Sequence, residues 1–74
     1  MNLRRLRHFE TLYRIGNFAR AADELGLTQS ALTRSIQKLE GELDAPLFDR
    51  STHYVRPTGA AERLIRSARD VIAA

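Results

Sequence analysis

Apolar residues recur at steps of three and four along the first part of the chain, which is the spacing of one face of an α-helix. Asn2 precedes the first such stretch and has the kind of side chain that caps a helix, and Gly16 follows its end. The apolar stripe consists of Leu3, Leu6, Phe9 and Leu12 or Tyr13. We therefore predict a first helix between Asn2 and Gly16.

Two further helical stretches follow, separated by Gly26. Their apolar positions are Phe18, Ala21, Ala22 and Leu25 in the second stretch and Leu32, Ile36, Leu39 and Leu43 in the third. Asn17 is placed to cap the second helix, and Thr28 is placed to cap the third, which should run to about Leu43. A turn of about three residues between two helices is the spacing of a helix-turn-helix.

The pattern changes after the third helix to two short runs, LFDR and YVRP, on either side of the polar residues 51–53. We expect Phe48 and Val55 to face the core and Arg50 and Arg56 to face away from it. For the neighbours Val55 and Arg56 this follows from extended backbone, in which successive side chains point to opposite faces. We predict a small two-stranded β-hairpin, which must pack against the helices because an isolated hairpin is only marginally stable.

Thr58 is placed to cap a last helix that is about 25 Å long if it continues to the end of the chain. Its apolar seam is longer than a small three-helix core can cover. We predict that part of the seam belongs to this core and that part pairs with a second copy of the chain. The residues predicted for this homodimer contact are Ala61, Leu64, Ile65, Ala68, Val71 and Ile72.

The outer face of the third helix is unusual for a solvated helix. Ser and Thr stabilise an exposed helix less than Lys, Glu or Ala, because their hydroxyls compete for backbone hydrogen bonds. The second helix of a helix-turn-helix enters the DNA major groove, where short side chains allow close approach, Gln pairs with adenine and Arg pairs with guanine. The residues predicted to contact DNA are Thr28, Gln29, Ser30, Thr33, Arg34 and Gln37, with Lys38 at phosphate. A merely solvated face is the alternative.

Composition and charge agree with a nucleic-acid partner without requiring one. The chain has 74 residues, with 12 Lys and Arg against 9 Asp and Glu, which gives a net charge of +3. A positive balance suits a polyanion, although many small basic domains bind nothing acidic. All but one of the cations are Arg, the better bidentate partner for phosphate and guanine.

Several classes of function have no support in the residues. There are no cysteines and only two histidines, His8 and His53, so we expect no disulfide, no metal site and no cofactor. Without a nucleophile beside a base, or a carboxylate pair with an evident pocket, we also expect no enzyme. No stretch approaches a signal peptide or the run of about 20 apolar residues that a membrane span needs, so we expect a cytoplasmic protein with no membrane partner, associated with the nucleoid when bound.

The segment FARAADELGLTQSALTRSIQKLEGELDAPLFDR resembles the DNA-binding region of the LysR-type transcriptional regulators. The resemblance extends from Leu3 to Ile72. Its marks are Phe18 with Ala21 and Ala22, the TQSAL segment, Ile36 with Leu39 and Glu40, the PLF segment, Arg50 and the hairpin end at Thr58. Together they form a specific pattern, although an Ala pair or a PLF segment alone would carry no weight.

The resemblance implies a mainly α fold: a winged helix-turn-helix with a three-helix core, a two-stranded β-hairpin wing and a long C-terminal linker helix that pairs two subunits. Residues 1–57 would form the DNA-binding domain, with residues 28–43 as the recognition helix, and residues 58–74 the linker helix. We expect a dimer bound to double-stranded DNA at an imperfect inverted repeat. A small-molecule effector would bind only a further domain that this chain lacks.

The chain departs from the family pattern at two places. Asp44 stands where the family usually has Gly, and an Asp in left-handed conformation is tolerated at a higher cost. Ala61 stands where the family has the Gly that follows Thr-x-Ala. Both changes lie outside the recognition helix, at the start of the wing and of the linker helix.

Other polar residues keep two interpretations each. Arg50 could contact DNA or pair with an acidic group that holds the wing, and His53 and Arg56 could reach phosphate or the minor groove or simply lie on a hairpin tip. Arg4, Arg5 and Arg7 concentrate positive charge on the first helix, where solvation is the alternative. We place His8 on the helix surface with no role.

Sequence-specific DNA binding by a transcriptional regulator is therefore the leading hypothesis. The main competitor is a protein-interaction module in which the polar face of the third helix docks a partner protein. RNA binding is disfavoured, because such a helix cannot read the narrow major groove of A-form RNA.

Overall fold

The computed structural model describes residues 2–50 and 55–74. These residues form α1 (Leu3–Ile15), α2 (Phe18–Leu25), α3 (Gln29–Leu43), β1 (Phe48–Asp49), β2 (Arg56–Pro57) and α4 (Gly59–Ala73). The strands pair antiparallel, with Phe48 opposite Pro57 and Asp49 opposite Arg56. The predicted fold class, a mainly α winged helix-turn-helix, is confirmed.

Each of the four helices begins at the cap that the sequence predicts. The side chain of Asn2 accepts hydrogen bonds from the amides of Arg4 and Arg5, and Asn17 accepts one from Arg20. Thr28 and Thr58 do the same for the amide three residues ahead. Each cap satisfies an amide that has no partner within its helix, which is why the helices begin at these residues.

Left-handed residues end the first three helices. Gly16 and Gly26 have φ of 73° and 68°, a conformation that glycine adopts without steric cost. Asp44 ends α3 with φ 53° and ψ 40°. This is the left-handed conformation anticipated for Asp44, and it is the only positive φ at a non-glycine residue within residues 2–50 and 55–74.

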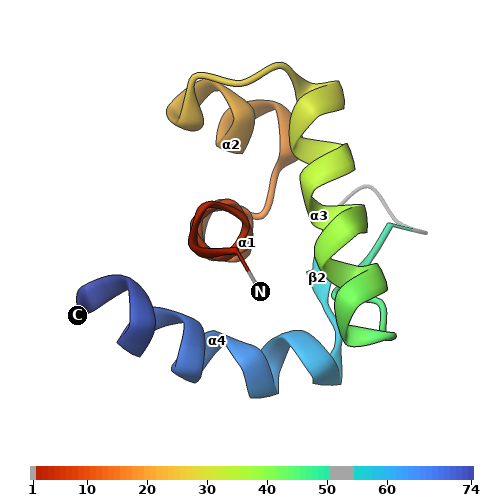
Figure 1. Ribbon diagram of the computed structural model, residues 1–74. Helices are drawn as coiled ribbons and strands as arrows, with labels where there is room; N and C mark the ends of the chain where they lie inside the picture. The colour runs from red at the N-terminus through yellow and green to blue at the C-terminus, as the bar shows by residue number, and fades with distance from the viewer. Residues whose placement is uncertain (1, 51–54) are drawn as a thin grey trace.

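Helix α1 lies at the centre of the fold. In Figure 1 it is seen end-on, with α2 above it, α3 along one side and α4 below. Phe9 and Leu12 of α1 are fully buried, as are Leu32 and Ile36 of α3. The core therefore forms where the three other helices meet the apolar stripe of α1.

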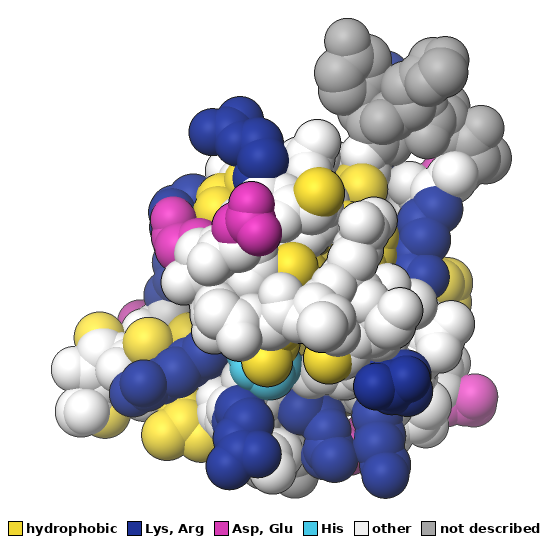
Figure 2. Space-filling view, turned by 90° about the horizontal axis from the view of Figure 1, so that it is seen from above, with side chains coloured by type: hydrophobic (Ala, Val, Ile, Leu, Met, Phe, Trp, Pro, Cys, Tyr) yellow, Lys and Arg dark blue, Asp and Glu magenta, His cyan; other side chains and the backbone are white. Residues whose placement is uncertain are grey.

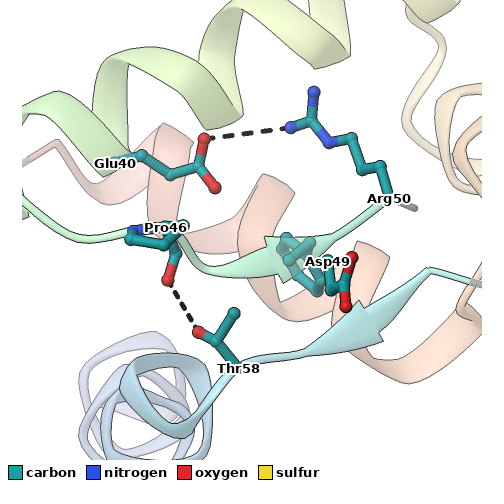
Figure 3. Close-up of a pocket in the computed structure, with 6 residues that line it drawn as sticks. Glu40, Pro46, Asp49, Arg50 and Thr58 are labelled. Atoms are coloured by element: carbon teal, nitrogen blue, oxygen red, sulfur yellow. Dashed lines mark hydrogen bonds and ion pairs between the residues drawn. The ribbon is translucent and has the colours of Figure 1, made fainter.

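The wing is attached to this core by its own apolar side chains. Phe48 is buried and its ring centroid lies 5.7 Å from that of Phe9, while Val55 is half-buried against the core. Arg56 is exposed on the opposite face, as the alternation predicts. The hydroxyl of Thr58 donates to the carbonyl of Pro46 at 2.6 Å, so the end of the wing is tied to its beginning (Figure 3).

The residues predicted for the dimer contact on α4 differ in how accessible they are. Ala61, Ile65 and Ala68 are buried within the chain itself, with exposed fractions of 0%, 8% and 1%. They pack in the core and do not offer a surface to a second chain. Helix α1 covers the flank of α4 that carries these three residues, so their predicted dimer contact stays a prediction that their burial does not favour.

The other seam residues remain accessible. Val71 is 50% exposed, and Leu64 and Ile72 are half-buried.

Within residues 2–50 and 55–74, no helix combines the length and the hydropathy that crossing a membrane requires. In the same part of the chain, no three His, Asp or Glu side chains converge as metal ligands.

Candidate nucleic-acid interface

Helix α3 has two sharply different faces. On the inner face Leu32, Ile36 and Leu39 are fully buried. On the outer face Thr33 is half-buried and the other predicted contact residues are exposed, namely Gln29, Ser30, Arg34, Gln37 and Lys38. No described part of the chain covers this outer face, so it is open to a partner along its length.

The N-terminal part of α3 is hollowed on its outer side. Gln29, Ser30, Thr33 and Arg34 line one shallow surface hollow there. The hydroxyl of Thr28 accepts a hydrogen bond from the amide of Ala31 at 3.1 Å, and Thr28 is exposed beside the hollow. Other amides of the first helical turn have no partner within the helix, so the start of α3 favours an anion. Short polar side chains, an arginine and a helix start are thus brought together.

The cations of this face differ from four other arginines of the fold, which form ion pairs. Arg5, Arg14, Arg50 and Arg69 each lie within 4.0 Å of a glutamate oxygen. Among the described residues, no carboxylate makes such a pair with Arg34 or Lys38. No carboxylate in residues 2–50 and 55–74 therefore compensates these two charges on α3, as is expected of groups that bind an anion.

Arg50 lies between the wing and the helices. Its guanidinium carbon is 4.7 Å from the ring centroid of Phe18 in α2, and its Nη2 is 3.9 Å from Oε1 of Glu40 in α3 (Figure 3). This geometry agrees with the alternative in which Arg50 pairs with an acidic group to hold the wing. Its DNA contact stays a prediction, since its side chain is still 36% exposed. His53 lies outside the described residues.

Glu40 is a positioning residue that helical periodicity did not identify. Its Oε2 accepts the amide of Leu47 at 2.7 Å, and Leu47 is fully buried just before β1. Through this bond and the contact with Arg50, one carboxylate on α3 sets where the wing begins. In the sequence Glu40 was visible only as part of the family pattern, because a glutamate seven residues before a buried leucine has no local signature.

His8 corrects the prediction that it lies on the helix surface. Only 9% of it is exposed, and its Nδ1 lies 2.7 Å from Oγ of Ser35 in α3. Burial lowers the pKa of His8 below 6.5, and the neighbouring charges of Arg4 and Arg5 lower the pKa further. His8 precedes Leu12 by one helical turn, so its place at the edge of the buried stripe could have been read from the sequence.

Comparison with known proteins adds sequence relatives. The family described as "Bacterial regulatory helix-turn-helix protein, lysR family" matches residues 3–62. The HTH-type transcriptional regulator YhaJ of Escherichia coli O157:H7 is 45% identical over 74 residues, which is 100% of this chain and 25% of that protein. The nitrogen assimilation regulatory protein nac of Klebsiella aerogenes is 40% identical and covers 97% of this chain and 24% of its own. The chain thus spans about a quarter of the length of these relatives.

Solved structures agree in fold as well as in sequence. The BenM_DBD/catB site 1 DNA complex has a TM-score of 0.94 at 34% identity and covers 99% of this chain and 81% of that chain. The CbnR_DBD-DNA complex has a TM-score of 0.93 at 33% identity and covers 99% of this chain and 84% of that chain. Both similar structures are complexes with DNA.

Proposed function

The chain belongs to the LysR family of bacterial regulatory helix-turn-helix proteins, and on this premise we propose that it binds a specific sequence of double-stranded DNA by placing α3 in the major groove. It does so as the DNA-binding part of a transcriptional regulator. The observation that carries the proposal is the open polar face of α3, with two cations that no described carboxylate pairs.

The dimensions of α3 suit this role. A helix with its side chains is about 10–12 Å across, and the major groove is about 12 Å wide. Ser30 and Thr33 are short, so they let the helix approach the base edges, where Arg34 is placed to bind guanine and Gln29 or Gln37 to bind adenine. Lys38 lies farther along the helix and contacts phosphate.

We also propose that two copies pair through the part of α4 that the core leaves accessible. Leu64, Val71 and Ile72 are the seam residues that remain for this contact. A symmetric dimer puts its recognition helices about 34 Å apart, or a multiple of that, so the site is an imperfect inverted repeat. The effector-binding function belongs to the rest of the longer regulator, which works in the bacterial cytoplasm.

The base-reading role is tested with Arg34→Ala. A duplex bound with high affinity is first selected from a random pool, and a shuffled duplex serves as the control. The substitution should weaken binding to the selected duplex by about 1–3 kcal/mol, with little change on the shuffled one, because only the base contact is lost. Equal losses on both duplexes would contradict base reading by Arg34.

The competing function, docking of a partner protein, is separated by salt. DNA binding through phosphate contacts weakens steeply as salt is added. Failure of the wild-type chain to bind any duplex at low salt, or binding that is insensitive to salt, would favour a protein partner for the polar face of α3.

The dimer contact is tested with Val71→Glu. Val71 is exposed, so the charge should lower the sedimenting mass of the chain without lowering its stability. If the wild type dimerises and Val71→Glu has the same mass distribution, Val71 does not lie in the interface.

A further inference from the structure

A second basic hollow lies beside the polar face of α3, between α3 and the first turn of α1. It has a volume of about 370 Å³ and is lined by Arg4, Arg5, Arg34 and Lys38, among others, with His8 and Ser35 also on its wall. Figure 2 shows Lys and Arg side chains gathered along one edge of the molecule, next to the histidine. The sequence alone does not distinguish solvation from function for these arginines of α1.

The charge in this hollow is largely uncompensated. Arg5 pairs with Glu42, with 3.0 Å between Nη1 and Oε1. No carboxylate among the described residues makes an ion pair with Arg4, Arg34 or Lys38. The lowered pKa of His8, to which Arg4 and Arg5 contribute, agrees with a positive potential in the hollow. Within the described part of the chain, Glu42 is therefore the one carboxylate that pairs with any of the four cations of this hollow.

The hollow is continuous with the surface that we propose to read bases. Arg34 lines both the hollow at the start of α3 and this second one. A helix that nearly fills the major groove faces bases with its tip and the phosphate backbone with its flanks. The flank that carries Lys38 continues onto α1, so Arg4 lies on the side where a DNA strand would run.

We propose that this basic hollow binds a backbone phosphate of the same duplex whose bases α3 contacts, with the side chains of Arg4 and Lys38 as its ligands. This inference rests on the proposed function. The contact comes from side chains and not from the helix start, because Asn2 already accepts the amides of Arg4 and Arg5. Arg5 holds Glu42 and thereby links α1 to the end of α3.

The experiment compares two variants that lose the same charge at different places. Arg4→Gln removes a proposed phosphate ligand, and Arg66→Gln removes an exposed arginine of α4. Arg66 lies one helical turn from Glu62 and from Arg69 on the same flank of α4. Glu62 contacts Tyr13 and Arg69 contacts Glu10, and both partners lie farther along α1 than Arg4. Arg66 is therefore a control away from the basic hollow. Long-range electrostatics change similarly in both variants, so a difference between them reports a local contact.

The readout is the salt dependence of binding to the selected and the shuffled duplex. Arg4→Gln should lower the slope of log K against log salt by about 0.9 on both duplexes, which is one phosphate contact. Between about 50 and 200 mM salt, the wild type should then lose about threefold more affinity than the variant. Arg66→Gln should keep the wild-type slope, and Arg4→Lys should restore it.

Each other outcome overturns the inference in a recognisable way. If the wild type binds the selected duplex and Arg4→Gln has the same slope as Arg66→Gln, the hollow binds no phosphate, while base reading by α3 stands. A loss confined to the selected duplex would make Arg4 a base contact instead. If the wild type binds no duplex at all, the proposed function fails together with this inference.

Discussion

Helices α3 and α4 are both 15 residues long, both begin at a threonine cap and both bury three side chains, yet they use their apolar faces differently. Helix α3 buries two leucines and an isoleucine completely. Helix α4 buries two alanines and Ile65, and it leaves Val71 half exposed. Their exposed faces differ as well, since α3 is polar and cationic there while α4 still carries apolar residues.

The difference indicates what kind of partner each helix lacks. The core completely buries Leu32, Ile36 and Leu39 of α3, so we expect further binding to use the polar side, where cations without a described carboxylate partner favour a polyanion. The apolar side of α4 is covered only in part, which supports the proposal that a second copy of α4 packs against it. The two helices thus carry the two proposed contacts, α3 with DNA and α4 with a second copy of the chain.

The largest expected effect contrasts a buried residue of α3 with an exposed one of α4. Ile36→Ala should lower the free energy of unfolding by about 2–5 kcal/mol, because it removes a fully buried side chain and leaves a cavity. Val71→Ala should change it by no more than about 0.5 kcal/mol. Urea unfolding followed by circular dichroism measures both.

The milder Ile36→Val, expected to cost about 0.5–1.5 kcal/mol, keeps the comparison measurable if the alanine variant does not fold. Similar losses for Ile36→Ala and Val71→Ala would break the contrast between the two helices, because Val71 would then have to be part of the core.

A smaller effect is expected where α3 holds the wing. Glu40→Ala removes the acceptor of the buried Leu47 amide and should cost about 1–3 kcal/mol of unfolding free energy. Glu40→Gln keeps an oxygen acceptor and loses only the long contact to Arg50, so it should cost no more than about 1 kcal/mol. Thermal and urea unfolding of both variants test this order, and equal costs would show that the Arg50 pair matters more than the amide.

The smallest effect concerns the contact between α1 and the polar flank of α3. Because the pKa of His8 is lowered in the folded chain, the unfolded chain takes up a proton first as the pH falls below 6.5. The stability from neutral His8 is therefore present above 6.5 and is lost as the pH falls through the lowered pKa. His8→Asn keeps an amide beside Ser35 but does not titrate.

Urea unfolding near pH 7.5 and pH 5.5 measures this effect, a range centred on the ordinary histidine pKa of about 6.5. The wild type should lose more stability on acidification than His8→Asn does. The same loss of stability in both chains would mean that protonation of His8 does not destabilise the fold.

Local signals in the sequence were sufficient for the helices and the wing. Caps at Asn2, Asn17, Thr28 and Thr58, together with apolar periodicity, predict where each helix begins and which face of α3 is buried. These features depend on residues within one or two helical turns, so a single chain reveals them. The outer face of α3 follows once its inner face is known.

Contacts between distant segments could not be predicted in the same way. An apolar seam on α4 fits a core contact as well as a dimer contact, and only the position of α1 shows that Ala61, Ile65 and Ala68 pack in the core. The bond from the Leu47 amide to Glu40 likewise depends on how the wing folds back. Such pairings are set by tertiary geometry, which periodicity does not contain.

The central claim is that the polar face of α3 contacts DNA, and amide NMR shifts of the 74-residue chain titrated with the selected duplex test it most directly. We expect the largest changes on residues 28–38 and on the first turn of α1, while the exposed flank of α4 changes little. Changes concentrated on α4, with residues 28–38 unaffected, would contradict it.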